Sequence, residues 1–298
     1  MSALNKTMQE RDMQKVTSKQ RVSKVLVKVL TYTFLTVMAI IVILPFYWMI
    51  ISSLKSPEEF RGTTTFFPMQ GIDFKNYVDV FNGEPLFLWF ANTAFVGIVS
   101  TLLSLVITVL SAFAFARLEF KGKNLLFGAL LATMMIPGEL FTITNFRTIF
   151  EWGWRDTYFA LIIPFLVSIF YIYLLRQNFM QIPNELYLAA KVDGTSDIKY
   201  LWKVMIPLSY PTLISITILK MMGAWNTYKW PELVASADHM KLITNGIRSA
   251  NYMMEGNQQP DTPVQMAAVF LVSIPLFLVF IFLRKYIMKG VSRSGIKG

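Results

Sequence analysis

Cysteine is absent from this chain of 298 residues, and histidine occurs only once, as His239. The lack of cysteine excludes disulfide bonds, thiolate metal sites and thiol nucleophiles. His239 lies in a polar loop and is expected to be solvated, so no metal site is predicted. Charged residues are also scarce, at 15%, against 54% hydrophobic residues. This composition excludes a fold built around a water-soluble core and predicts a protein that lies largely in lipid.

Six apolar segments are candidates for transmembrane helices, each of which needs about 20 apolar residues to cross a bilayer. Four of them contain no charged residue and cover 29–54, 85–116, 157–175 and 262–283. The fifth is 124–143, with Glu139 near one end, and the sixth is about 208–230, which Lys220 interrupts. The sequence therefore predicts an all-α membrane protein with six transmembrane helices.

Lysine and arginine are concentrated in alternate loops, and cytoplasmic loops are the ones that carry an excess of basic residues. Seven, three, four and five of them lie in segments 1–28, 117–123, 176–203 and 284–298. Three, two and three lie in the intervening loops 52–84, 144–156 and 229–261. Both termini are therefore expected in the cytoplasm. The predicted organisation is a tail, 1–24, one membrane domain, 25–287, and a second tail, 288–298.

The net charge of +10 is attributed to this topology and to anionic lipid. No basic run is interleaved with aromatic residues, as a groove for single-stranded nucleic acid requires. Nucleic acid is therefore not expected as a partner.

A polar segment, 177–206, separates two apolar blocks and is expected to fold as two short cytoplasmic helices; it is called the coupling segment below. Asn184 can cap a first helix that runs to about Val192, and Gly194 tolerates the positive φ of a break. Helical spacing places three apolar residues on one face of the first helix, namely Leu186, Ala189 and Ala190. Such a segment offers a rigid surface to a partner protein.

The second helix of the coupling segment can be capped by Thr195 or Ser196, and Pro207 is expected to end it at the membrane. An amphipathic helix that lies on lipid headgroups is the alternative. The chain has no G-x-x-x-x-G-K-[ST] sequence to hold nucleotide phosphates. If ATP powers transport, a partner must hydrolyse it.

Several short motifs occur along the chain in the order found in one family of membrane proteins. They are Pro45-Phe46, Asn92-Thr93, 111–123, Met134 to Pro137 with Glu139, Ala189-Ala190 with Gly194, Trp225-Asn226, and Gly290 with Gly295. Together they resemble the permeases of binding-protein-dependent ABC importers of the maltose-permease type. The chain departs from the family pattern at Leu188, where the family has Glu, and at Thr195, where it has Ala.

The resemblance implies a non-catalytic, six-span subunit of a carbohydrate importer in a bacterial cytoplasmic membrane. The implied partners are a second related permease, two ATPase subunits and an extracytoplasmic solute-binding protein that delivers a saccharide. ATP and Mg would be bound by the ATPases, and this chain would bind no cofactor. The residues implied in coupling to the ATPase are Glu185, Leu186, Ala189, Ala190, Asp193, Gly194, Val204, Ile206 and Pro207.

Lys220 lies near the middle of a predicted span, where ionisable residues usually face the bundle interior or a water-filled path. It can line the solute route and attract an acidic saccharide, such as a uronate. Alternatively, it pairs with a carbonyl or a neighbouring subunit, or it reaches toward the headgroups. Trp225 and Asn226 complete the candidate pathway, although Trp225 is more typical of an aromatic belt at the membrane interface than of sugar stacking.

Small residues recur along one face of the second predicted span, and they are Gly97, Thr101, Ser104, Thr108 and Ser111. This stripe predicts close packing against another helix, with a hydrophilic passage as the alternative.

The loop 231–262 is long for a connection between spans, and such connections tend to be functional or disordered. By resemblance to the family, part of it would contact the docked binding protein through Asn251, Glu255 and Asp261. The alternative is a loop folded on its own membrane edge.

Other function classes fit less well. A membrane-embedded enzyme needs convergent reacting groups, and an ion-coupled carrier usually has an acidic residue at the membrane midplane. The predicted spans contain neither pattern. Within the importer class, a permease for another solute, such as a polyol or glycerol phosphate, remains the alternative.

Overall fold

The computed structural model describes residues 2–62, 65–250, 252–253 and 260–292, with the backbone alone for 2–22, 283 and 285–292. Within these ranges the chain is helical and forms no β-strand, which confirms the all-α prediction. The α-helices are α1 (Ser2–Ser53), α2 (Pro57–Gly62), α3 (Lys75–Gly83), α4 (Leu86–Arg117), α5 (Lys123–Thr133), α6 (Thr142–Glu151), α7 (Tyr158–Ile162), α8 (Ile169–Met180), α9 (Asn184–Val192), α10 (Asp197–Tyr200), α11 (Ile206–Leu208), α12 (Tyr210–Asn226), α13 (Lys229–Val234), α14 (Ile243–Ser249) and α15 (Thr262–Ser292). Short 3-10 or π turns are η1 (Gly138–Phe141), η2 (Ile163–Phe165), η3 (Leu201–Met205) and η4 (Asp238–Met240).

Three of the predicted spans are single helices that are long and apolar enough to cross a membrane. They are Ser23–Ser53 within α1, the whole of α4, and Thr262–Phe282 within α15. Three further spans are bent pairs. The bend is 82° between α5 and η1–α6, 45° between α7–η2 and α8, and 80° between α10–α11 and α12. Counting each bent pair as one span gives the six spans that the sequence predicts.

The predicted span 124–143 is not one straight helix. α5 ends at Thr133, and the chain turns through Pro137 before α6 begins. Proline has no backbone N–H and therefore interrupts helical hydrogen bonding. Glu139 lies in this turn, where its carboxylate is 3.0 Å from the Lys229 ammonium, so its charge lies outside the apolar helix.

The second coupling helix ends one residue after Pro207, close to the predicted end. The helix continues to Leu208, and the 80° bend follows at Ser209, before α12 begins. The π turn η3 ends at Met205, two residues before Pro207. Its wider i→i+5 bonding lets the backbone adjust where proline supplies no donor. The crossing part of this span is α12, which is shorter than the predicted 208–230.

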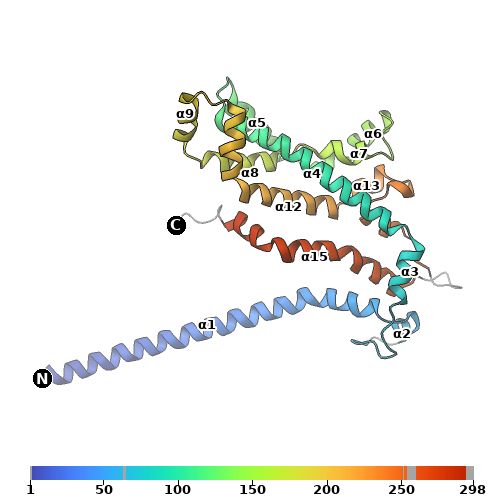
Figure 1. Cartoon of the computed structure of the whole chain (residues 1–298). Helices are drawn as coiled ribbons and strands as arrows, with labels where there is room; N and C mark the ends of the chain where they lie inside the picture. Colours follow the sequence, from blue (N-terminus) through green and yellow to red (C-terminus); the bar gives the residue numbers. More distant parts are fainter. Residues whose placement is uncertain (1, 63–64, 251, 254–259, 293–298) are drawn as a thin grey trace.

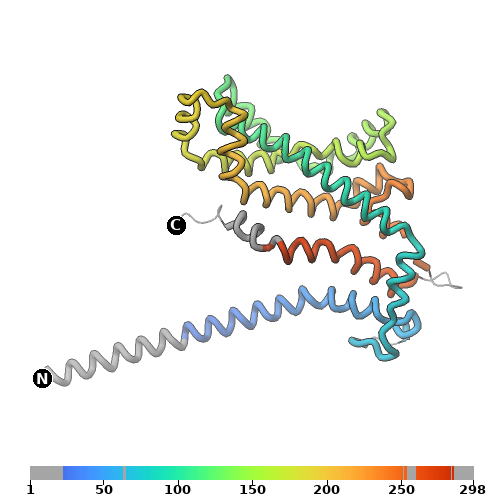
Figure 2. Tube along the Cα trace, in the orientation of Figure 1, coloured from blue at the N-terminus to red at the C-terminus, as the bar shows by residue number. Residues whose placement is uncertain are grey.

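α4 lies at the centre of the helix bundle and packs against α8 and α12. α12 also contacts α15, and α15 contacts α1, which lies at the edge of the protein (Figure 1). Figure 2 shows the same arrangement, with α1 and α15 beside each other. The apolar side chains of α1 between Val25 and Leu44 are largely exposed, as expected for a surface that faces lipid.

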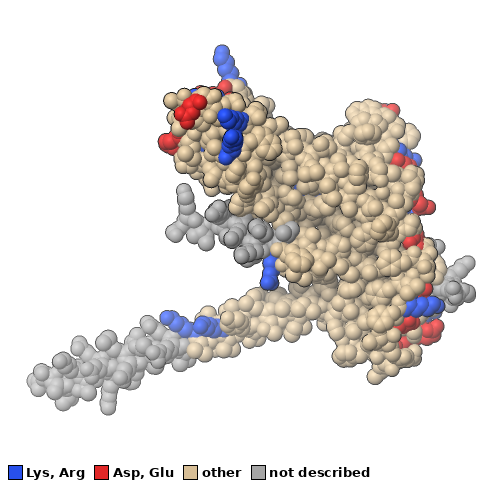
Figure 3. All heavy atoms as spheres, in the orientation of Figure 1, with Lys and Arg blue, Asp and Glu red and all other residues tan. Residues whose placement is uncertain are grey.

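Charged side chains gather at the two ends of the bundle, and uncharged residues form a band between them (Figure 3). The α4–α5 turn and α9 lie at one end, whereas α2, α3, α6 and α13 lie at the other (Figure 1). The chain thus returns to the same end after every second span. The coupling segment and the α4–α5 turn therefore share one face of the membrane.

Candidate coupling segment and solute cavity

The coupling segment folds as two helices with the break that the sequence predicts. Gly194 has a φ of +69°, and the Thr195 amide donates to the Ala190 carbonyl at 2.8 Å, which closes the end of α9. The Ser196 hydroxyl accepts from the Lys199 amide at 3.4 Å and caps α10. The break at Gly194 and the cap at Ser196 are confirmed.

Asn184 does not cap α9, contrary to the prediction. Pro183 precedes the helix, and the Asn184 Oδ1 accepts instead from the Arg117 guanidinium at 3.4 Å. Arg117 ends α4 and also donates to the carbonyls of Phe179 and Ile182, at 2.9 and 2.5 Å. One guanidinium therefore joins the ends of α4 and α8 to the start of α9, so the coupling segment is attached firmly to the spans.

Polar and aromatic contacts hold the two coupling helices together. Asp197 accepts a hydrogen bond from the Tyr187 hydroxyl at 2.8 Å and lies 2.7 Å from the Lys191 ammonium. The Tyr187 ring is 5.1 Å from the ring of Tyr200, which is buried at the end of α10. These contacts fix α9 relative to α10.

Asp197 makes the stability of the coupling segment depend on pH. Hydrogen bonds from Lys191 and then from Tyr187 lower the pKa of Asp197 below its ordinary value of 3.8. A carboxyl with a lowered folded-state pKa stabilises the fold at higher pH, and this stabilisation is lost as the pH falls through that pKa.

We expect Asp197→Asn to lower the unfolding midpoint of the purified protein at pH 7. The effect should be below about 1 kcal/mol because the ion pair is partly exposed. The difference from the unmodified protein should shrink as the pH falls below 3.8 and through the lowered pKa of the Asp197 carboxyl. Thermal unfolding in detergent over a series of pH values from 7 downward measures this, and a deficit that does not change with pH would contradict it.

The exposed surface of α9 includes most of the predicted residues and extends beyond them. Tyr187 and Ala190 pack against the core of the bundle, whereas Leu188 and Val192 are 56% and 88% exposed. The predicted residues Glu185, Leu186 and Ala189 are also exposed. Sequence reasoning missed Leu188 and Val192, although their i, i+4 spacing placed them on one face.

The remaining predicted coupling residues divide into two groups. Ile206 is buried and Val204 is half-buried, and both pack into the core beneath the segment. Asp193, Gly194 and Pro207 are exposed. Ile206 therefore supports the segment from below and does not offer a surface to a partner.

A cavity of about 380 Å³ lies between α4, α8, α12 and α13, and Lys220 lines it with Ser168, Tyr171 and Trp230. The Lys220 ammonium donates to the Phe165 carbonyl at 2.6 Å. No acidic side chain among the described residues forms an ion pair with it. An ammonium has three donors, so two remain for a ligand in the cavity.

The broken fourth span explains this arrangement. Pro164 supplies no amide, so the Ala160 carbonyl four residues earlier lacks its helical donor. The Trp230 indole N–H donates to that carbonyl at 2.9 Å. The turn between η2 and α8 leaves the Phe165 carbonyl without a helical donor as well. The Lys220 ammonium donates to this carbonyl. Backbone N–H and C=O groups within a membrane must form hydrogen bonds inside the protein. Lys220 and Trp230 supply these bonds at the break in the span, and both also line the cavity.

Trp225 is buried between helices, at 8% exposure, so its ring faces neighbouring helices and not the surroundings of the bundle, as a residue of an aromatic belt would. Its ring is 5.5 Å from that of Phe90, and its indole N–H donates to the Val272 carbonyl at 3.2 Å. Pro275 disturbs the hydrogen bonding of α15 next to this carbonyl. Trp225 therefore joins α12 to the proline-containing region of α15.

Asn226 is exposed, and its side chain donates to a carbonyl one turn earlier in its own helix, at 2.9 Å. Neither Asn226 nor Trp225 lines the cavity around Lys220. Trp230 and Tyr171 do so instead, and sequence reasoning missed both because Trp230 follows α12 and Tyr171 comes from another span.

The small-residue stripe of α4 packs closely against α12, as predicted. A Cβ added to Gly97 would lie 3.0 Å from the Met221 sulfur. The polar members Thr101, Ser104 and Thr108 are buried. Close helix packing is confirmed at Gly97.

The Asn92-Thr93 pair anchors the loop that follows α13. Asn92 donates to the carbonyls of His239 and Lys241 at 2.9 and 3.1 Å. The Thr93 hydroxyl accepts from the Ile243 amide at 2.8 Å. Residues 235–250 are therefore folded on the bundle itself, while His239 is exposed as predicted.

Two of the three residues predicted to contact a binding protein, Asn251 and Glu255, lie outside the described residues. The third, Asp261, accepts from the Val264 amide at 3.3 Å at the start of α15. Burial raises the pKa of Asp261 above 3.8.

Residues 13–293 match the family described as binding-protein-dependent transport system inner membrane component. The chain is similar to the arabinooligosaccharides transport system permease protein AraQ of Halalkalibacterium halodurans, with 28% identity over 94% of this chain and 100% of AraQ. It is 27% identical to the polygalacturonan/rhamnogalacturonan transport system permease protein YtcP of Bacillus subtilis, over 90% of this chain and 97% of YtcP. A chain of a solved bacterial ABC transporter, involved in the import of the acidic polysaccharide alginate, has a similar fold. Its TM-score is 0.79 and its identity is 24%, over 89% of this chain and 97% of that chain.

Proposed function

The chain belongs to the family of binding-protein-dependent transport system inner membrane components, and we propose from this membership that it is the permease subunit of an ATP-driven importer of a saccharide. The names of AraQ and YtcP, which describe oligosaccharide and polysaccharide transport systems, support the solute class. The observation that carries the proposal is the coupling segment, which is anchored to two spans by Arg117 and exposes Leu188 and Val192.

A second permease, two ATPase subunits and an extracytoplasmic binding protein complete the proposed importer. The ATPases bind ATP and Mg, and α9 docks on one of them, so both termini of this chain lie in the cytoplasm. ATP binding closes the ATPases and shifts the permeases toward the outward-facing state. Each ligand acts only through its different affinity for the two states. This chain transmits force and forms part of the solute path, and it breaks no bond itself.

The first test is purification of the chain from its native membranes, followed by identification of the proteins bound in stoichiometric amounts. The expected result is an ATPase and a second permease, and reconstituted vesicles should take up saccharide only with ATP inside and binding protein outside. A chain that is recovered alone and carries solute down an ion gradient would overturn the proposal.

The proposed saccharide is acidic, because the cavity contains the Lys220 ammonium without an acidic partner in the described part of the chain. A carboxylate that reaches the cavity can accept the two unused donors of this ammonium. Hydrogen bonds to charged groups contribute about 1.5–3 kcal/mol. Lys220 thus provides discrimination between a uronate and a neutral sugar.

Lys220→Met is expected to reduce ATP-driven uptake of an oligouronate by about tenfold or more, since a charge-assisted hydrogen bond is lost. Lys220→Arg is the matched control and should retain most of the uptake. Uptake of a neutral oligosaccharide by the same variant measures any general damage from the unsatisfied Phe165 carbonyl. Equal losses for acidic and neutral saccharides would exclude Lys220 as a contact for the substrate.

A further inference from the structure

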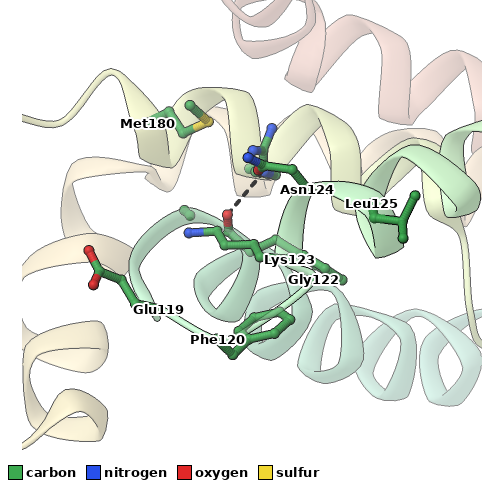
Figure 4. Close-up of a pocket in the computed structure, with 10 residues that line it drawn as sticks. Glu119, Phe120, Gly122, Lys123, Asn124, Leu125 and Met180 are labelled. Carbon is green, nitrogen blue, oxygen red and sulfur yellow. Dashed lines mark hydrogen bonds between the residues drawn. The ribbon is translucent and has the colours of Figure 1, made fainter.

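A second pocket, of about 510 Å³, lies at the same end of the bundle as the coupling segment. It is formed by the end of α4, the start of α5 and the end of α8 (Figure 4). Its basic residues are Lys123 and Arg176, and its one acidic residue is Glu119. The Glu119 carboxylate points outward from the edge of the pocket (Figure 4) and attracts the Lys123 ammonium without forming an ion pair with it. With two basic side chains and one acidic one, the pocket carries a net positive charge.

The two cations are held in place by the backbone and not by acidic side chains. The Arg176 Nε donates to the Phe115 carbonyl at 3.1 Å, and its guanidinium carbon lies 4.1 Å from the centre of the Phe127 ring. The Lys123 ammonium donates to the Leu118 carbonyl at 2.9 Å. Neither forms an ion pair with an acidic side chain in the described ranges. Both therefore keep donors for an anion.

The rim of the pocket favours a lipid over a soluble anion. Leu125 is 81% exposed, and Phe120 and Met180, which lie at other parts of the rim, are exposed as well (Figure 4). A small soluble anion gains nothing from these apolar side chains. A phospholipid can place its phosphate between the two cations and its acyl chains along the apolar rim.

We propose that this pocket binds the phosphate of an anionic phospholipid through Arg176 and Lys123. Basic pockets between transmembrane helices recognise such headgroups. The pocket includes the end of α4, next to Arg117, which holds the start of α9. The lipid therefore binds beside the attachment point of the coupling segment. This proposal is independent of which solute the protein carries.

The test uses the assembled complex in mild detergent, titrated with phosphatidylglycerol and monitored by native mass spectrometry. The double variant Arg176→Gln with Lys123→Gln should weaken lipid binding about thirtyfold, since each basic residue near the surface contributes about fivefold. Lys121→Gln is the matched control because Lys121 lies in the same turn, is exposed and does not line the pocket. It should leave the affinity unchanged, and phosphatidylcholine should bind weakly throughout.

Equal retention of phosphatidylglycerol by the double variant and the unmodified complex would overturn the proposal. Displacement of the lipid by millimolar inorganic phosphate would also overturn it and would assign the pocket to a soluble anion. If the double variant fails to assemble, Lys123→Gln alone should give a loss of about fivefold. This single change leaves the contact between Arg176 and Phe127 intact.

Discussion

Val192→Asp is expected to release the ATPase subunits from the permease and to abolish most ATP-driven uptake. Val192 is 88% exposed at the end of α9, and the proposed ATPase would cover it. An unpaired charge buried in an interface costs about 2–5 kcal/mol. This cost corresponds to an association about thirtyfold to several thousandfold weaker. The amount of ATPase that remains on affinity-purified permease measures the effect directly.

The matched control is Val78→Asp, which introduces the same side chain on α3, at the opposite end of the bundle (Figure 1). Val78 is also exposed, at 54%, so neither change disturbs the core, and both variants should keep the unfolding midpoint of the unmodified permease. Only Val192→Asp should lose its ATPase. Normal uptake and full ATPase retention by Val192→Asp would show that this face of α9 is not the docking surface.

The straight spans could be predicted from the sequence because a charge-free run of about 20 residues has few alternatives to a membrane helix. The shapes of the bent spans could not. Pro164 marks a lost backbone donor, but the replacement donor is Trp230, 66 positions further along the chain and in another element. The packing of the spans decides which side chain donates a hydrogen bond to the free carbonyl of a broken helix. The pattern of apolar residues within one span does not contain that information.

In the coupling segment too, features set by neighbouring residues could be predicted, and features set by tertiary contacts could not. The break at Gly194 and the cap at Ser196 depend on local backbone conformation, so neighbouring residues suffice to predict them. The buried face of α9 depends on the contact between Tyr187 and Tyr200 and on the packing of Ala190 against the core. A helix as short as α9 has apolar residues on more than one side, and only the tertiary contacts show which side is covered.

Gly246→Ala is expected to destabilise the protein by about 1–3 kcal/mol, the usual cost of overpacking a close contact. A Cβ at position 246 would lie 2.4 Å from two atoms of the Trp89 ring. The ring cannot turn aside freely, because its indole N–H donates to the Asp238 carbonyl at 3.1 Å. Relief requires α14 to move away from α4, which would strain the bond between the Ile243 amide and the Thr93 hydroxyl. Thermal unfolding of the detergent-purified complex measures the loss.

Gly128→Ala is the matched control, since an added Cβ at position 128 meets nothing within 4 Å. Alanine favours a helix over glycine by about 1 kcal/mol, so this variant should be as stable as the unmodified protein or more so. Gly246→Ala should therefore lower the unfolding midpoint, whereas Gly128→Ala should leave it unchanged or raise it. Similar shifts would mean that the contact between Trp89 and Gly246 does not hold residues 235–250 on α4. A lower midpoint and reduced uptake for Gly246→Ala alone would show that the position of this loop matters for accepting the solute.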